Sequence, residues 1–272
     1  MVTTAPVHSP AMPTSAQAAR RSMTIVLPAY NEAKRIGPAL DELFAYLDAP
    51  SVEGVHPRID ILVVDDGSTD GTADLVRARS EAARSPEGDQ ASLAILSVAH
   101  AGKGSAVRSG MLAATGDLVV FADADMATPP GELPKLTAAL ESADVALGSR
   151  IQPDGSDMRA SQPRFRRTLG AVFHALASIW VVGDVQDTQC GFKGFTREAA
   201  QDLFSRQRVT SIVFDVELIH LARRRGYRIA VVPIRWEDVR GSRMHPGAAL
   251  ALRVAWDLFR IPLLHRSVRR RK

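Results

Sequence analysis

The chain has 272 residues, of which 46% are hydrophobic and 24% are charged, the balance of an ordinary soluble globular protein. This length is enough for one large domain or two small ones. A formal net charge of +4 is too small to indicate a nucleic-acid partner. The single cysteine, Cys190, excludes an internal disulfide and favours a reducing compartment.

The sequence predicts no transmembrane helix. The longest weakly charged run, residues 168–183, is interrupted by His174 and is shorter than the roughly 20 residues that span a bilayer. Residues 1–21 are dominated by Pro, Ser, Thr and Ala, and we expect them to form a disordered tail. Composition therefore favours a cytoplasmic protein, and any membrane association has to be argued from its surfaces.

Strands and helices alternate in the first part of the chain. The expected strands are residues 23–27, 59–64, 93–98, 117–122 and 145–147. The expected helices between them are residues 33–47, 70–79, 103–115 and 132–142, the first of them capped by Asn31. This order predicts an α/β protein with a mostly parallel sheet and helices on both faces.

The alternation ends after Arg150. A polar loop is expected over residues 151–162, where Pro, Gly, Ser and Asp gather. It is followed by expected helices at 165–182, 196–204, 213–225 and 247–264 and by an expected strand at 228–234. We therefore expect one domain over residues 22–246, and an amphipathic helix with a basic tail over 247–272.

Acidic residues follow two of the expected strands. Asp123 and Asp125 come directly behind residues 117–122, and Asp66 lies behind residues 59–64. Residues two apart on an extended chain point to the same side, so both carboxylates can project where open α/β sheets bind ligands. Two hard oxygen ligands suit a divalent cation, Mg²⁺ or Mn²⁺, that also holds a phosphate. The simpler alternative is a solvated turn, because Asp-x-Asp is a common pattern.

Several motifs in order resemble those of the family-2 inverting glycosyltransferases. They are Pro28-Ala29-Tyr30-Asn31-Glu32, residues 65–70 and Asp123-Ala124-Asp125. Residues 102–111, 148–150, 186–193 and 214–218 narrow the resemblance to the dolichyl-phosphate glucosyltransferase branch and its bacterial polyprenyl-phosphate relatives. The resemblance runs from about Met23 to Ile261. It implies a single nucleotide-sugar-binding Rossmann-like domain of the GT-A type, and an inverting, metal-dependent hexosyltransferase.

The resemblance also implies roles for individual residues on the donor side. Asp125 is implied as the metal contact and as a catalytic residue, with Asp123 beside it toward the nucleoside. The implied contacts of the donor nucleotide are Pro28, Tyr30, Glu32, Asp66, Lys103 and Asp123. Lys103 does not belong to a phosphate-binding P-loop, because Gly104 follows where that motif needs Ser or Thr. An ordinary surface lysine remains an alternative.

A lipid-phosphate acceptor needs cationic side chains to bind it more than it needs a general base. A phosphate monoester has a second pKa of about 6 and is already an anionic nucleophile at pH 7. By resemblance Arg150, together with Arg166 or Arg167, holds the acceptor phosphate, since a guanidinium fork suits phosphate. A solvated helix start is the alternative for the arginines near 166. Asp187 stands where hydroxyl-using relatives carry their base; here it orients the acceptor, helps to hold the metal, or is a structural turn residue.

These expectations together predict transfer of glucose from UDP-glucose to a polyprenyl phosphate with inversion, giving a β-linked lipid-phosphate sugar. The alternatives are a mannosyltransferase that uses GDP-mannose, a transferase to a soluble hydroxyl acceptor with Asp187 as base, and a non-catalytic nucleotide-sugar-binding module. The expected partners are the donor, the lipid acceptor and the inner face of the membrane. Residues 165–182 and the last helix with its basic tail are expected to meet that membrane, unless both helices simply cover the sheet.

Overall fold

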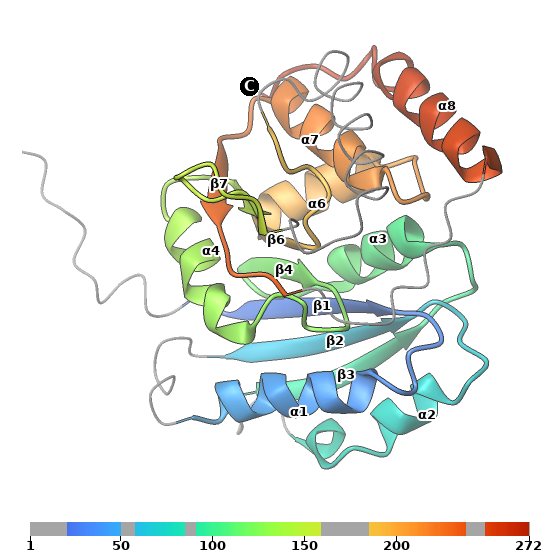
Figure 1. Ribbon diagram of the computed structural model, residues 1–272, viewed down its shortest axis with the longest axis vertical. Coiled ribbons are helices and arrows are strands. Elements are labelled where there is room, and N and C mark those ends of the chain that lie inside the picture. Colours follow the sequence, from blue (N-terminus) through green and yellow to red (C-terminus); the bar gives the residue numbers. More distant parts are fainter. Residues whose placement is uncertain (1–20, 50–57, 85–90, 159–184, 238–247, 272) are drawn as a thin grey trace, which may run out of the picture.

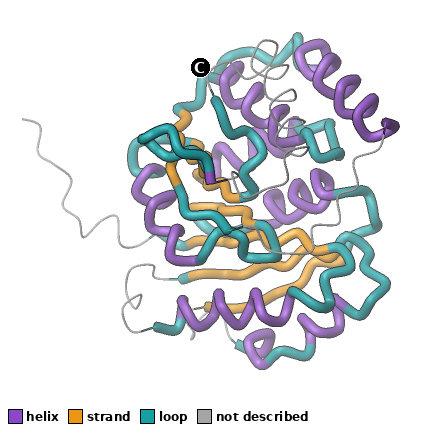
Figure 2. The backbone as a smooth tube through the Cα atoms, in the orientation of Figure 1, coloured by secondary structure: helices purple, strands orange, loops and turns teal. Residues whose placement is uncertain are grey.

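The computed structural model describes residues 21–49, 58–84, 91–158, 185–237 and 248–271. In this part of the chain a seven-stranded sheet carries helices on both faces (Figures 1 and 2). The strands are β1 (Met23–Ala29), β2 (Ile59–Asp65), β3 (Ala91–Ser97), β4 (Leu118–Ala122), β5 (Val145–Ser149), β6 (Phe192–Thr196) and β7 (Ile229–Pro233). Their order in the sheet is β3-β2-β1-β4-β6-β5-β7.

The described helices match most of the expected ones within a few residues. They are α1 (Ile36–Leu47), α2 (Thr72–Arg77), α3 (Lys103–Ala113), α4 (Leu133–Ala139), α6 (Arg197–Arg206), α7 (Phe214–Arg225) and α8 (Ala248–Leu264). Two short 3₁₀ turns, Ser80–Ala83 and Pro130–Glu132, accompany them. The expected helix over 165–182, with Arg166 and Arg167, and residues 1–20 of the expected amino-terminal tail lie outside the described residues.

The sheet confirms the prediction of a mostly parallel α/β fold. β1 pairs in parallel with β2 and β4, β2 with β3, and β5 with β7. Parallel strands end at the same edge of the sheet, so the segments that follow β1, β2 and β4 come together there. This edge carries the acidic motifs.

β6 is the element that the sequence analysis missed. It runs antiparallel between β4 and β5, and its last residue, Thr196, caps α6 by accepting the backbone N–H of Ala199. Five residues with Lys193 and Gly194 at their centre do not form an apolar run. Lys193 is nevertheless fully buried, which explains why a hydrophobic pattern did not find the strand.

The start of α1 also differs from the prediction, because Asn31 is not its cap. The helix begins at Ile36, and the residue before it, Arg35, makes no side-chain cap. Asn31 adopts a left-handed conformation with φ of 55°, and its side-chain oxygen accepts the backbone N–H of Thr69 at 2.8 Å. The asparagine therefore joins the segment after β1 to the segment after β2.

Alternate residues of the central strands face two hydrophobic cores. On β1, Ile25 and Leu27 pack in the core that α1 and α4 cover, whereas Val26 packs in the core that α3, α6, α7 and α8 cover. Figure 1 shows α3, α6, α7 and α8 above the sheet and α1 and α2 below it. The sheet is thus buried on both faces, as parallel sheets require.

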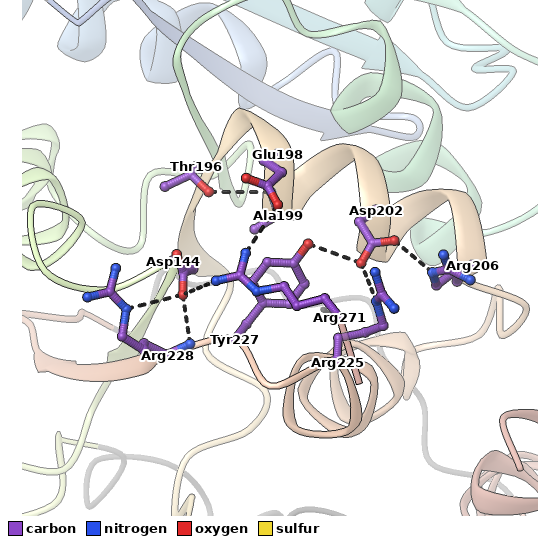
Figure 3. A network of polar contacts seen from close by, with 10 residues as sticks. All are labelled: Asp144, Thr196, Glu198, Ala199, Asp202, Arg206, Arg225, Tyr227, Arg228 and Arg271. Carbon is purple, nitrogen blue, oxygen red and sulfur yellow. Dashed lines mark hydrogen bonds and ion pairs between the residues drawn. The ribbon is translucent and has the colours of Figure 1, made fainter. Parts of the chain in front are cut away.

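The chain behind α8 folds back onto the body of the protein. The backbone N–H of Arg271 donates to the carbonyl of Arg225, and its guanidinium lies 3.1 Å from Glu198 and 4.3 Å above the ring of Tyr227. Figure 3 shows this network, which also contains Asp144. The last described arginine is therefore a packing residue. No helix in the described ranges has the length and apolar character that a membrane crossing requires.

Candidate active site

The candidate site lies behind the carboxyl ends of β1, β2 and β4. Asp66, directly after β2, is only 2% exposed, and its two carboxylate oxygens accept the backbone N–H groups of Ala101 and Gly102 at 2.9 and 3.0 Å. These two N–H groups precede α3, so Asp66 fixes the start of that helix. Its predicted contact with the nucleotide stays a prediction.

An aromatic surface stands beside Asp66. The rings of Tyr30 and His100 are stacked with centroids 4.1 Å apart and planes 19° apart, and Tyr30 is 42% exposed. The Nδ1 atom of His100 lies 2.8 Å from Asp66. His100 was not among the predicted site residues. Its position just after β3, at the same sheet edge as the acidic motifs, was the available signal.

Two other predicted donor residues have structural partners. Glu32 accepts two hydrogen bonds from the guanidinium of Arg35, at 2.6 and 2.5 Å, and its backbone N–H donates to Thr72. Pro28 belongs to β1 itself and stands next to its last residue. Both therefore lie at the predicted edge, where Glu32 also organises the segment between β1 and α1.

Lys103 and Asp123 form the central ion pair of the site. The Lys103 ammonium lies 2.5 Å from Asp123 Oδ1. Burial acts to lower the pKa of Lys103, but the carboxylates of Asp123 and Asp215 outweigh it and raise that pKa. The lysine therefore remains a cation directed at the acidic motif, and its predicted contact with the nucleotide stays a prediction.

Gly191 makes room for the Asp123 carboxylate. Its carbonyl accepts the backbone N–H of Asp123 at 3.0 Å, and a Cβ atom on Gly191 would overlap that carboxylate. The sequence analysis included Gly191 in a motif without giving it a role. Only the close approach of two segments far apart in the sequence reveals it.

Asp125 is the less compensated of the two acids. Its carboxylate accepts the backbone N–H of Ala127 at 3.2 Å, and Arg35 lies 3.7 Å away. Burial and the neighbouring Asp123 raise the pKa of Asp125. A carboxylate in such surroundings is stabilised by a nearby cation.

The acidic pair fits a divalent cation of the Mg²⁺ or Mn²⁺ type. Among the described residues no group of three or more His, Cys, Asp or Glu side chains gathers as a metal site. Asp123 and Asp125 thus supply at most two protein ligands. Mg²⁺ is commonly bound in this way, through one or two carboxylates, with substrate phosphates and water completing its coordination.

On the other side of β4, Arg150 and Asp187 form a tight pair. The backbone N–H, Nε and Nη2 of Arg150 donate to the Asp187 carboxylate at 2.8, 2.8 and 2.6 Å, and the guanidinium lies 5.5 Å above the Trp236 ring. Burial acts against the charge, but Asp187 outweighs it and raises the pKa of Arg150. Asp187 thus orients a permanent cation, and its predicted roles toward the acceptor and the metal stay predictions.

The segment from Asp187 to Gly191 connects the two halves of the site. Its first residue, Asp187, accepts hydrogen bonds from Arg150, and its last, Gly191, accepts the backbone N–H of Asp123. Between them Cys190 is buried, and burial together with Asp187 raises the pKa of its thiol to about 12. The thiol is therefore packed and not nucleophilic at neutral pH.

A buried layer supports this segment from below. The ammonium of Lys193 is 2.5 Å from the carbonyl of Cys190 and 2.7 Å from Asp215 at the start of α7. It also lies 5.3 Å above the ring of Phe121. Removing either partner of this buried ion pair would leave the other charge buried without compensation and would strongly destabilise the fold.

The comparisons with known proteins point to one family. The model of the family described as Glycosyl transferase family 2 matches residues 24–204. A dolichyl-phosphate beta-glucosyltransferase of Trichomonas vaginalis is 38% identical over 251 residues, 90% of this chain and 72% of that protein. Proteins of the same name from Drosophila melanogaster and Homo sapiens are 36% and 34% identical, over 88% and 83% of this chain and 74% and 70% of their own.

Solved structures show the same fold. Glucosyl-3-phosphoglycerate synthase from Mycobacterium tuberculosis, in complex with UDP, superimposes with a TM-score of 0.61 at 23% identity, covering 95% of this chain and 86% of that one. A second structure of that synthase, in complex with Mn²⁺, UDP and glucosyl-3-phosphoglycerate, gives a TM-score of 0.59 at 22% identity over 95% and 85% of the two chains. The GT-A type of fold is thereby confirmed.

Proposed function

Since the chain belongs to the family-2 glycosyltransferases, we propose that it transfers glucose from UDP-glucose to a polyprenyl phosphate of the dolichyl type, with inversion at the anomeric carbon. The observation that carries this proposal is the pairing of a strand-end acid pair with a fixed, permanently charged arginine at the same sheet edge. The names of the relatives supply the sugar and the acceptor.

On the donor side, we assign the base and ribose to an aromatic surface and the diphosphate to charged groups. The Tyr30–His100 stack offers a flat surface for the base or the ribose. Asp66 fixes the start of α3, and thereby places Lys103 where its ammonium approaches the diphosphate. A divalent cation on Asp125 and Asp123 would supply Lewis-acid stabilisation of the departing nucleotide. The identity of that cation, Mg²⁺ or Mn²⁺, belongs to the proposal.

The acceptor side needs a cation and no general base. An ionised lipid phosphate attacks the anomeric carbon from the face opposite to the diphosphate, which accounts for inversion. Arg150 attracts and orients that phosphate, and Asp187 keeps the guanidinium in place. A hydroxyl acceptor would require proton removal, and Asp187 is already bound to Arg150. The arrangement therefore favours a phosphate acceptor.

We further propose that the protein works as a peripheral protein at the inner face of a membrane, where its lipid acceptor resides. Support comes from the class of substrate named for its relatives. The domain limits 22–246 and 247–272 likewise stay predictions.

The test is the partition of label after reaction. The protein is incubated with Mg²⁺ or Mn²⁺, polyprenyl phosphate and labelled UDP-glucose or GDP-mannose, and the mixture is extracted with organic solvent. We expect label in the organic phase from UDP-glucose. Organic label from GDP-mannose alone would refute the donor, label only in a water-soluble product would refute the acceptor, and no transfer at all would favour a binding module.

A further inference from the structure

The start of α3, where Lys103 lies, is held from two sides. On one side, the carboxylate of Asp66 accepts the two backbone N–H groups that directly precede the helix. On the other side, the backbone N–H of Gly104 donates to the carbonyl of Thr210 at 3.1 Å. Because Lys103 stands between these two contacts, both of them fix the point from which its side chain reaches toward Asp123.

The second contact is close and has a further hydrogen bond beside it. A Cβ atom on Gly104 would lie only 2.8 Å from the carbonyl oxygen of Thr210. The buried side chain of Gln207 donates from Nε2 to the carbonyls of Gly104 and Val209 at 2.9 and 2.8 Å. The segment 207–210 therefore lies directly against the first turn of α3, and a shift of this segment would move the helix start with it.

Glu217 of α7 holds this segment in place. Its Oε1 accepts the backbone N–H of Arg208 at 2.9 Å, and its Oε2 accepts that of Val209 at 2.8 Å. The carboxylate is fully buried, and the Nε2 atom of His265, just beyond α8, lies 2.6 Å from Oε1. Two backbone donors and one ring nitrogen thus converge on one side chain, which joins α7, the segment 207–210 and the end of α8.

We infer that Glu217 is a positioning residue for Lys103, and through it for the diphosphate of the donor. The carboxylate fixes the segment 207–210, this segment fixes the start of α3, and the start of α3 directs the ammonium of Lys103 toward Asp123. His265 extends the same series of contacts to the end of α8. The inference deepens the proposed function and rests on it for the role of Lys103 at the diphosphate.

Asp202 of α6 offers a matched comparison for a purely structural role. Its carboxylate also receives three donors, from Arg206, Arg225 and Tyr227 at 2.8, 2.6 and 3.0 Å (Figure 3). These partners lie outside the segment 207–210. Loss of either carboxylate should lower the melting temperature, because each leaves its donors without an acceptor. Only the loss of Glu217 should reach the donor site.

The first test measures the Kd for UDP in the presence of Mn²⁺ by calorimetry, and then the KM for each substrate. In Glu217→Gln an amide NH₂ group replaces one acceptor and faces a backbone N–H. We expect the Kd for UDP and the KM for UDP-glucose to rise, by no more than the roughly tenfold effect of one charged contact. The KM for the lipid acceptor should stay unchanged, because Arg150 is held by Asp187.

The variant Asp202→Asn is the control and should leave the Kd and both KM values at the wild-type level. An unchanged Kd for UDP in Glu217→Gln would overturn the inference. An equal rise of that Kd in Asp202→Asn would overturn it too, because the effect would then follow stability and not position.

A double variant tests whether the effect passes through Lys103. In Lys103→Ala the ammonium is absent, so adding Glu217→Gln should change the Kd for UDP by less than about twofold. A structural effect independent of Lys103 would add in full to that of Lys103→Ala. Full additivity would therefore overturn the inference.

Gln207→Met gives the same test if Glu217→Gln does not fold. The Oε1 atom of Gln207 is buried, and among the described residues it has no hydrogen-bond partner. Methionine has a similar size and removes this oxygen together with the link to Gly104, so the fold should tolerate it. The Kd for UDP should rise as in Glu217→Gln, and again not in the Lys103→Ala background. An unchanged Kd would count against the inference.

Binding and transfer separate this inference from the proposed function. If wild type binds UDP with Mn²⁺ but transfers nothing to polyprenyl phosphate, the proposed function fails, and the UDP affinities of the variants still decide on Glu217. If wild type does not bind UDP, Lys103 has no diphosphate to meet, and both fail.

Discussion

The ammonium of Lys103, at the start of α3, lies 2.5 Å from the carboxylate of Asp123, behind β4. This contact joins two residues that the resemblance assigns to the donor nucleotide, and Asp123 also belongs to the predicted metal-binding pair. It gives the acidic pair a protein cation of its own, and any divalent cation there shares Asp123 with it.

Replacing Lys103 should therefore separate metal binding from nucleotide binding. In Lys103→Ala, the ammonium no longer competes for Asp123, so Mn²⁺ binding without nucleotide, measured by electron paramagnetic resonance, should become tighter. The KM for UDP-glucose should rise roughly tenfold, the size of one charged contact. Lys135→Ala removes another lysine paired with an acid, Glu132, outside the site, and should change neither. Weaker Mn²⁺ binding in Lys103→Ala would contradict the shared-ligand interpretation.

A substitution at Gly191 tests whether the position of the Asp123 carboxylate matters for activity. In Gly191→Ala the new methyl group overlaps the Asp123 carboxylate, which must rotate away from Lys103. We expect kcat/KM to fall about 100-fold, the usual effect of a small misplacement at a reacting site, with little change in the melting temperature. Gly37→Ala meets no atom within 4 Å and serves as the control. A fully active Gly191→Ala would show that Asp123 does not need this position.

Variants of Arg150 and Asp187 can show whether Asp187 orients the guanidinium or acts as a general base. Asp187→Asn removes the charge that fixes the guanidinium, so the KM for the acceptor should rise while the shape of the pH–rate profile stays the same. Arg150→Lys keeps the charge, loses the fork, and should raise the same KM by about tenfold. Loss of roughly 10²–10⁴ in kcat for Asp187→Asn, together with loss of the acidic limb of the profile, would identify Asp187 as a base.

The raised pKa of Asp125 leads us to expect that metal binding depends on pH. Burial and Asp123 raise its pKa, so the folded protein holds this proton more tightly than the unfolded chain. Ionised Asp125 therefore weakens the metal-free fold above the folded pKa, and this penalty vanishes below the unfolded pKa near about 4. Because a metal ligand must be ionised, Mn²⁺ affinity should fall on acidification before the ordinary Asp range is reached.

Asp123→Asn provides the comparison for that titration. It removes the neighbouring charge and leaves the burial of Asp125, so the fall in Mn²⁺ affinity should move partway to lower pH. Superimposable curves for wild type and Asp123→Asn would show that the two carboxylates are not coupled.

The elements that the sequence predicted well are those whose apolar runs are continuous. β1, β2 and β4 are buried on both faces, and their ends place Asp66, Asp123 and Asp125 at one edge. β6 escaped prediction because a buried Lys193 needs Asp215, more than twenty residues away in sequence, to compensate its charge. Asparagine is a common helix-capping residue, but the Asn31 side chain instead accepts a hydrogen bond from the backbone of Thr69, which follows β2.

The candidate site divides in the same way. Residue types and strand ends pointed to the carboxylates, and the family resemblance pointed to Lys103 and Arg150. The roles of Gly191, of His100 and of Asp187 as the partner of Arg150 depend on contacts between distant segments, which one sequence does not display.

The central claim is that an acid pair anchors the cation of the leaving nucleotide while Arg150 holds the ionised lipid head. The most direct test is a crystal structure of the protein with Mn²⁺, UDP and a short-chain prenyl phosphate, using the anomalous signal of manganese. The account predicts manganese bound to Asp125, in contact with the diphosphate, and the prenyl phosphate on the guanidinium of Arg150. Manganese bound away from both aspartates, or a phosphate that does not touch Arg150, would contradict it.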